Sequence, residues 1–179
     1  MNTRIIDEEH LDPQLDAEIK KGLCRCFPPD VGIFSQTRKW HGTGPAWTVI
    51  LMDNDAVAAH VGIVDRVIRA GRQEIRVAGI QNVFVLPEYR GRGLGTVIMD
   101  AAMAEAVKCH YECGFLFCVP ELEKVYAQCG WQLIAKEKIL RTDETGQEVS
   151  LPEKNIAMFY PISLRAFPQG IIHLQGNDW

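Results

Sequence analysis

Three glycines separated by single residues lie between a predicted strand and a predicted helix, in the stretch Arg90-Gly91-Arg92-Gly93-Leu94-Gly95. Glycine has no Cβ atom, so the backbone here can approach a ligand closely and point successive N–H groups into one space. These groups fall at the first turn of a helix predicted over about 94–109, where they are unpaired and the helix dipole favours negative charge. The stretch therefore predicts a cradle for a pyrophosphate, with structural turn glycines as the alternative interpretation.

Two familiar nucleotide-binding motifs do not fit this stretch. A P-loop requires Gly-Lys-Ser/Thr at the helix start, and Leu94-Gly95-Thr96 lacks the lysine. A dinucleotide fingerprint opens a parallel βαβ unit, whereas here the strand ends an antiparallel meander and Pro87-Glu88-Tyr89 intervenes. Arg90 and Arg92 could add charge-assisted contacts to a phosphate.

The segment from Val85 to Gly95 resembles the acyl-CoA-binding motif of the GNAT N-acetyltransferase superfamily, Arg/Gln-x-x-Gly-x-Gly/Ala, with Arg90, Gly93 and Gly95 at its fixed positions. The resemblance implies acetyl-CoA as co-substrate. It also implies that the strand before the loop splays from its neighbour and binds the pantetheine arm through its backbone. The cofactor-binding residues implied in this way are Val83, Phe84, Val85, Arg90, Gly91, Arg92, Gly93, Leu94, Gly95 and Thr96.

A second segment, Glu123 to Trp131, resembles the GNAT helix whose tyrosine lies near the coenzyme sulfur in many members. Acyl transfer expels a thiolate, and a positioned phenol can protonate it or donate a hydrogen bond as charge develops. Tyr126 is therefore the candidate general acid. The alternative is a core tyrosine on an apolar helix face.

Two groups within the superfamily show the strongest resemblance, and both act on amino sugars. The Gly130-Trp131 pair and the segment Gly176 to Trp179 are similar to aminoglycoside 2′-N-acetyltransferases, which implies that Asp178 and the Trp179 carboxylate lie in the acceptor cleft. The segment Ala58 to Arg69 also resembles the nodulation N-acyltransferases, which place a fatty acyl chain on a chitooligosaccharide amine. Trp40, within the irregular segment 30–45, is a further candidate acceptor contact, since irregular aromatic segments often cover a ligand cleft; a plug over the core is the alternative.

The sequence departs from the aminoglycoside enzymes at Gln81, where the resemblance implies a glutamate that relays the proton of the amine. A neutral amide cannot accept that proton, although it can orient a water molecule. Gln81 stays a candidate catalytic residue in this role. His60 or the Trp179 carboxylate could act as the base instead, or the amine could lose its proton in solvent; for His60, a bonded structural histidine is the alternative.

The elements expected around these residues form a mixed α/β, or α+β, domain with a central, mostly antiparallel sheet that splays at the acyl-CoA site and is flanked by helices. Apolar residues at helical or strand spacing define the boundaries. We predict helices over 11–23, 94–109 and about 120–130, strands over 47–52, 56–69, 75–86, 115–119, 131–134 and 156–162, and loops over 30–45 and 141–155.

Composition restricts the class of protein. The 179 residues are 47% apolar and 23% charged, as in an ordinary globular protein, and we expect a single domain over 1–179. The formal charge of −4 disfavours nucleic-acid binding, and no basic amphipathic segment predicts membrane association. Without an export signal at Met1, a cytoplasmic location and reduced thiols are expected for the six cysteines.

Neither cysteine cluster, Cys24 to Cys26 or Cys109 to Cys113, has the Cys-x-x-Cys pairs of a structural zinc site, so no metal is expected. The expected activity is direct transfer of an acetyl group from acetyl-CoA to a primary amine of a small molecule in a ternary complex. A longer acyl donor and a non-catalytic acyl-CoA-binding module are the alternatives. A homodimer is an expectation from the superfamily alone.

Overall fold

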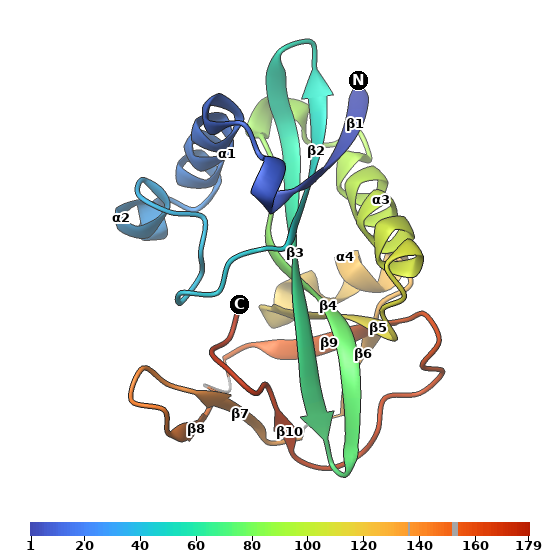
Figure 1. Ribbon diagram of the computed structural model, residues 1–179. Coiled ribbons are helices and arrows are strands. Elements are labelled where there is room, and N and C mark those ends of the chain that lie inside the picture. The colour runs from blue at the N-terminus through green and yellow to red at the C-terminus, as the bar shows by residue number, and fades with distance from the viewer. Residues whose placement is uncertain (136, 152–153) are drawn as a thin grey trace.

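The computed structural model describes residues 1–135, 137–151 and 154–179. Within these residues ten strands form one sheet, whose two longest members are β3 (Ala56–Ala70) and β4 (Gln73–Val85) (Figure 1). The other strands are β1 (Asn2–Asp7), β2 (Trp47–Asp53), β5 (Cys113–Cys118), β6 (Gln132–Leu133), β7 (Ile139–Thr142), β8 (Glu148–Ser150), β9 (Ile156–Pro161) and β10 (Ile172–His173). The helices are α1 (Pro13–Cys26), α2 (Val31–Phe34), α3 (Leu94–Lys108) and α4 (Glu123–Gln128). The predicted α+β class is confirmed.

The sheet is continuous from β1 through β2, β3 and β4 to β5, but the junction between β4 and β5 differs from the others. It is parallel and short, joining Val77–Ile80 to Cys113–Leu116, whereas β3 and β4 pair in antiparallel fashion along nearly their full length. Beyond Ile80, β4 continues to Val85 beside β3 alone. The sheet therefore opens between β4 and β5, as the resemblance to the GNAT superfamily implied.

A β-bulge in β4 marks the place where the sheet opens. The register against β3 shifts so that Gln81 faces Gly62 whereas Phe84 faces His60. Asn82, inside the bulge, has a left-handed backbone with φ of +56°. Its carbonyl accepts a hydrogen bond from His60 Nδ1 at 2.8 Å, and bulges of this kind bend a strand and redirect its side chains.

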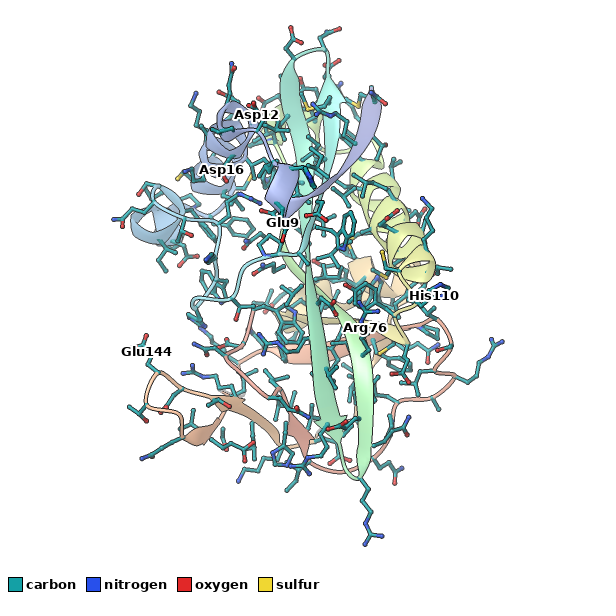
Figure 2. The ribbon with its side chains drawn as sticks, viewed as in Figure 1. Glu9, Asp12, Asp16, Arg76, His110 and Glu144 are labelled. Carbon is teal, nitrogen blue, oxygen red and sulfur yellow. The ribbon has the colours of Figure 1, made fainter. Side chains whose placement is uncertain are left out.

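Helices cover both faces of the β3–β4 ribbon, α1 and α2 on one side and α3 on the other (Figure 1). Helix α1 begins where the Asp12 carboxylate caps the N–H groups of Gln14 and Leu15, and Figure 2 places Asp12 and Asp16 along it. Its apolar stripe packs on Phe84. At the far end of α3, Arg76 of β4 donates to the carbonyl of Cys109 at 3.0 Å, beside His110 in Figure 2.

The structure corrects several predicted boundaries. The segment 30–45, predicted as irregular, contains α2, and the segment 141–155, predicted as a loop, contains most of the β7–β8 hairpin. The predicted strand 131–134 shrinks to Gln132–Leu133. Strands β1 and β10 were not predicted, because the first is largely exposed and the second has two residues, so neither carries an apolar pattern.

None of the helices in the part of the chain that the structure describes combines the length and the apolar character required to cross a bilayer.

Candidate active site

A cleft of about 310 Å³ lies between the start of α3 and helix α4. Gly91 and Gly93 have left-handed backbones with φ of +74° and +72°, and a Cβ atom built on either would meet no atom within 4 Å. A Cβ atom built on Gly95, in the first turn of α3, would likewise meet no atom within 4 Å. The loop thus leaves open space in front of the unpaired N–H groups at the start of α3. This space fits the pyrophosphate of a coenzyme.

Eight of the ten predicted cofactor-binding residues line this cleft. They are Val83, Val85, Arg90, Gly91, Gly93, Leu94, Gly95 and Thr96. Arg90 also ties the loop to the strand, since its Nε donates to the carbonyl of Val85 at 3.0 Å. The cleft therefore joins the free edge of β4 to the glycine loop, which is the arrangement that an extended pantetheine arm ending in a pyrophosphate requires.

Phe84 and Arg92 do not line the cleft. Leu86 N–H donates to the carbonyl of Ala58 on β3, so the backbone of Phe84, two residues earlier, also faces β3, and that of Val83 and Val85 faces the cleft. The Phe84 ring instead stacks on His60, with ring centroids 5.5 Å apart. Arg92 Nη2 donates to the carbonyl of Glu88 at 3.1 Å and lies over the ring of Tyr89.

A second cavity, of about 450 Å³, occupies the opening between β4 and β5. Its walls come from the bulge of β4 at Gln81–Val83, from Leu116–Val119 around the end of β5, from α2 with the segment that follows it, and from the end of the chain. Val83, Leu122 and Tyr126 line both this cavity and the cleft. The two spaces therefore meet at Tyr126.

The phenol of Tyr126 is kept protonated by its surroundings. Burial raises its pKa, and the neighbouring thiols of Cys118 and Cys129 add to the effect. The ring packs edge-on against Trp131, with centroids 6.2 Å apart. At neutral pH the side chain is a hydrogen-bond donor at the junction of the two cavities, as a general acid must be.

The other two candidate catalytic residues have different positions. Gln81 is 4% exposed and lines the second cavity, and neither polar atom of its amide has a partner among the described residues. His60 is fully buried and lines neither space. Burial lowers the pKa of His60 to about 3, so the imidazole is neutral, and its Nδ1 is engaged by the carbonyl of Asn82. The structure thus places His60 behind the bulge and Gln81 in front of it.

The three predicted acceptor contacts, Trp40, Asp178 and Trp179, all line the second cavity. Trp40 stacks on Phe34 with centroids 5.6 Å apart. Asp178 is already paired, because its Oδ1 accepts from His41 Nδ1 at 2.9 Å and lies 3.6 Å from Arg141 Nη1. Its carboxylate is therefore largely neutralised, in contrast with the expectation of an acidic cleft for a polycationic amine.

Sequence reasoning missed the residues that hold these walls together. Arg38, 6% exposed, donates to both carboxylate oxygens of Glu8, to Asp16 at 2.6 Å and to Thr48 at 3.0 Å. Its carbonyl accepts from Asn82 Nδ2 at 2.7 Å, which fixes the segment before β2 against the bulge. These partners lie far from Arg38 in the sequence, so no local pattern indicated them.

Among the described residues, no group of three or more His, Cys, Asp or Glu side chains is arranged to hold a metal ion. The six cysteines are free thiols.

The fold and the site define a protein with the GNAT N-acetyltransferase fold, which confirms the resemblance seen in the sequence. The structure is similar to a GNAT family N-acetyltransferase (YhbS) from Escherichia coli in complex with CoA, with a TM-score of 0.66 and 15% identity over 98% of this chain and 91% of that one. It is also similar to a GNAT family acetyltransferase from Brucella melitensis in complex with acetyl-CoA, with a TM-score of 0.61 and 16% identity over 96% of this chain and 94% of that one.

The chain belongs to the Nodulation protein A (NodA) family, whose family model matches residues 1–174. It is 28% identical over 95 residues to Nodulation protein A of Rhizobium leguminosarum bv. viciae, covering 51% of this chain and 48% of that protein. It is 24% identical over 128 residues to an aminoglycoside 2′-N-acetyltransferase of Mycolicibacterium fortuitum, covering 72% of this chain and 63% of that protein. The chain spans about half the length of the first of these curated relatives.

Proposed function

We propose that this chain is an acyl-CoA-dependent N-acyltransferase that transfers an acyl group longer than acetyl to the primary amine of an amino sugar. One observation carries the proposal. The glycine-loop cleft and the second cavity meet at Tyr126, between two strands that have separated, so a thioester and an amine can meet at one point. Holding two reactants in line supplies much of the rate of such a transfer.

The family match supports the longer donor over acetyl-CoA. The nodulation N-acyltransferases, which the sequence resembles, act with a fatty acyl chain, and the family model extends over nearly all of this chain. The shape of the second cavity agrees, because Leu116, Phe117, Val119 and Leu122 form an apolar wall beyond the junction at Tyr126. An acetyl group would leave most of that wall without a partner.

The residues at the junction have defined tasks in this reaction. The nitrogen of the amine attacks the thioester carbonyl, a C–N bond forms and the C–S bond breaks. The backbone N–H of Val83, on the free edge of β4, donates to the oxygen that becomes negative. Tyr126 donates its proton to the departing thiolate and regains one from solvent, while the amine releases one.

Neither Gln81 nor His60 is suited to take the proton of the amine. Gln81 is neutral at every pH, and His60 is buried behind the bulge with a pKa of about 3. We therefore propose that the amine enters in its neutral form. The rate at low acceptor concentration then rises with pH up to the pKa of the amine itself.

A thiol-release assay with acyl-CoA donors of increasing chain length tests the proposal. Glucosamine oligomers, aminoglycosides and polyamines serve as acceptors. We expect release that depends on the acceptor, is greatest for the glucosamine oligomers and increases from acetyl to longer donors. Binding of acyl-CoA without release of free thiol in the presence of any acceptor would instead favour the non-catalytic module. Release of thiol from acetyl-CoA alone would favour the shorter donor.

A further inference from the structure

His60 is a fully buried polar side chain that lines neither the glycine-loop cleft nor the second cavity. Its Nδ1 lies 2.8 Å from the carbonyl oxygen of Asn82, and its Nε2 has no partner among the described residues. A carbonyl oxygen can only accept, so Nδ1 carries the proton of the neutral ring and Nε2 holds a lone pair. Burial of an unpaired ring nitrogen costs free energy, so the one hydrogen bond that His60 makes requires an explanation.

That hydrogen bond fixes the orientation of one peptide group. The Asn82 carbonyl and the Val83 N–H belong to the same peptide, and the structure records no cis peptide bond in its described residues, so the two groups point in opposite directions. Neither residue has a partner in the register of β4 with β3 or with β5. Because His60 of β3 holds the carbonyl, the Val83 N–H points away from β3, to the side where β4 and β5 have separated.

A second contact holds residue 82 from another direction. The Asn82 backbone is left-handed, with φ of +56°, a conformation that asparagine adopts more readily than most residues. Its Nδ2 donates at 2.7 Å to the carbonyl of Arg38, a buried residue that is paired with Glu8 and Asp16. Rotation of the Asn82–Val83 peptide would therefore break the bond to His60, and displacement of the whole residue would break the bond to Arg38.

The imidazole ring is held in turn by Phe84. His60 and Phe84 are partners across β3 and β4, and their rings stack with centroids 5.5 Å apart and planes 21° from parallel. On helix α1, Gly22 lies so close to the Phe84 ring that a Cβ atom there would collide with it. The stack thus keeps the imidazole beside β4, with its Nδ1 edge toward the bulge.

We infer that His60 is a positioning residue of the proposed transfer: through the Asn82 carbonyl it orients the Val83 N–H toward the thioester oxygen on which negative charge develops. The inference rests on the proposed function and deepens it. A donor that is oriented before the reaction contributes about 10²- to 10³-fold to kcat in acyl transfer. His60 acts here without touching a substrate and without gaining or losing a proton, so its role differs from that of a base.

Two variants of the same shape test the role. Leucine and asparagine are both branched at Cγ and both lack the imidazole ring, but only asparagine places an N–H donor where Nδ1 stands. In the thiol-release assay with saturating donor and acceptor, we expect His60→Leu to lower kcat about 10²-fold and His60→Asn to recover most of it. The KM for acyl-CoA and the dissociation constant of coenzyme A should equal those of the wild type in both variants, because the cleft is unchanged.

A role in folding alone would give a different result. Both variants lose the stack on Phe84, so loss of packing should lower their kcat values equally. Equal kcat values for His60→Leu and His60→Asn, whether lowered or not, would therefore overturn the inference. Circular dichroism at the assay temperature confirms that both variants are folded.

The tautomer of His60 tests the hydrogen bond without any turnover. In the full chain labelled with ¹⁵N at its five histidines, NMR distinguishes a ring nitrogen that carries a proton from one that does not. The signals missing from His60→Asn assign those of His60. We expect a proton on Nδ1 and none on Nε2 at pH 7, and a proton on Nε2 alone would overturn the inference.

The outcomes keep the inference and the proposed function apart. Thiol release from the wild type with equal kcat in the two variants supports the transfer and contradicts the positioning role. Absence of thiol release from the wild type with every donor and acceptor contradicts the transfer, and the tautomer then decides whether His60 holds the Asn82–Val83 peptide.

Discussion

At the scale of single residues, the proposed chemistry depends most on Tyr126. Its phenol lies where the two cavities meet, and burial raises its pKa, so it holds its proton throughout the neutral range. Tyr126→Phe removes the proton donor and keeps the ring on Trp131. We expect kcat to fall about 10²- to 10⁴-fold, the usual contribution of a positioned general acid, with little change in the dissociation constant of acyl-CoA. Stopped-flow thiol release measures this; full activity of the variant between pH 6 and 9 would remove the general-acid role.

His60 controls stability rather than proton transfer. Burial lowers its pKa from the ordinary histidine value of about 6.5 to about 3. As the pH falls below 6.5, His60 takes up a proton in the unfolded chain but stays neutral in the folded chain. The free energy of unfolding is therefore highest above that pH and decreases on acidification. His60→Gln keeps a donor for the Asn82 carbonyl and removes this titration.

Urea unfolding at pH 6.5 and pH 5, above the range of the carboxylates, measures the effect. The free energy of unfolding of the wild type should fall by about 1 to 2 kcal/mol more than that of His60→Gln across this interval. Equal losses in the two proteins would mean that His60 is protonated in the folded state.

At the scale of elements, the glycine loop before α3 can be separated from an ordinary turn. Gly93 and Gly146 both have positive φ, +72° and +81°, and a Cβ atom on either would meet nothing within 4 Å. Alanine at each site should therefore cost a similar backbone strain of about 1 kcal/mol. Of these two glycines, Gly93 lines the glycine-loop cleft and Gly146 does not.

Gly93→Ala should raise the dissociation constant of coenzyme A about tenfold, because the new methyl group enters the space in front of the helix N-terminus. Gly146→Ala should match its loss of stability and keep the affinity of the wild type. Titration calorimetry measures the dissociation constant of coenzyme A, and scanning calorimetry measures the loss of stability. If Gly93→Ala and Gly146→Ala bound coenzyme A equally well, the pyrophosphate would lie elsewhere.

Elements with a local signal were the ones that the sequence predicted. Helices α1 and α3 carry apolar residues at helical spacing, and β3 and β4 carry long β-branched runs, so their positions followed directly. Strand β1 has no such pattern and exists because it pairs with β2. The glycine loop could also be predicted from a local signal, because the residues that define it are six consecutive ones.

The second cavity could not be predicted in this way. Trp179 packs on Gly79 only because the end of the chain lies across β4, and the pairs of Arg38 and of Asp178 also join distant segments. The resemblance to the aminoglycoside enzymes implied Asp178 and Trp179 as acceptor contacts, but the charge balance around them required the structure. Arg141 and His41, which neutralise Asp178, gave no signal of their own.

At the scale of the whole molecule, residues 175–179 connect parts of the second cavity that are far apart in the sequence. Figure 1 places the end of the chain beside the middle of β3. The Gly176 carbonyl accepts from Thr142 of β7, and Asn177 Nδ2 donates to the carbonyl of His41 before β2. The Trp179 ring packs against Phe115 and Phe117, with centroids 5.8 Å away in each case. This segment therefore supports the second cavity, and none of its residues lines the glycine-loop cleft.

A variant that ends at Leu174 should consequently bind the acceptor more weakly and keep its affinity for coenzyme A. Without the Trp179 ring, Phe115 and Phe117 lose a packing partner, and removing a buried tryptophan costs about 3 to 5 kcal/mol, so the Tm falls. If the variant stays folded, we expect the KM of the acceptor to rise at least tenfold, since the Trp179 wall of the second cavity and the contact of Asn177 with the His41 carbonyl are gone, while coenzyme A binds as in the wild type. Calorimetry with coenzyme A at a temperature where circular dichroism shows a folded protein provides the check. Equal loss of coenzyme and acceptor binding would show that the two cavities depend on the same support, and that the end of the chain has no separate role on the acceptor side.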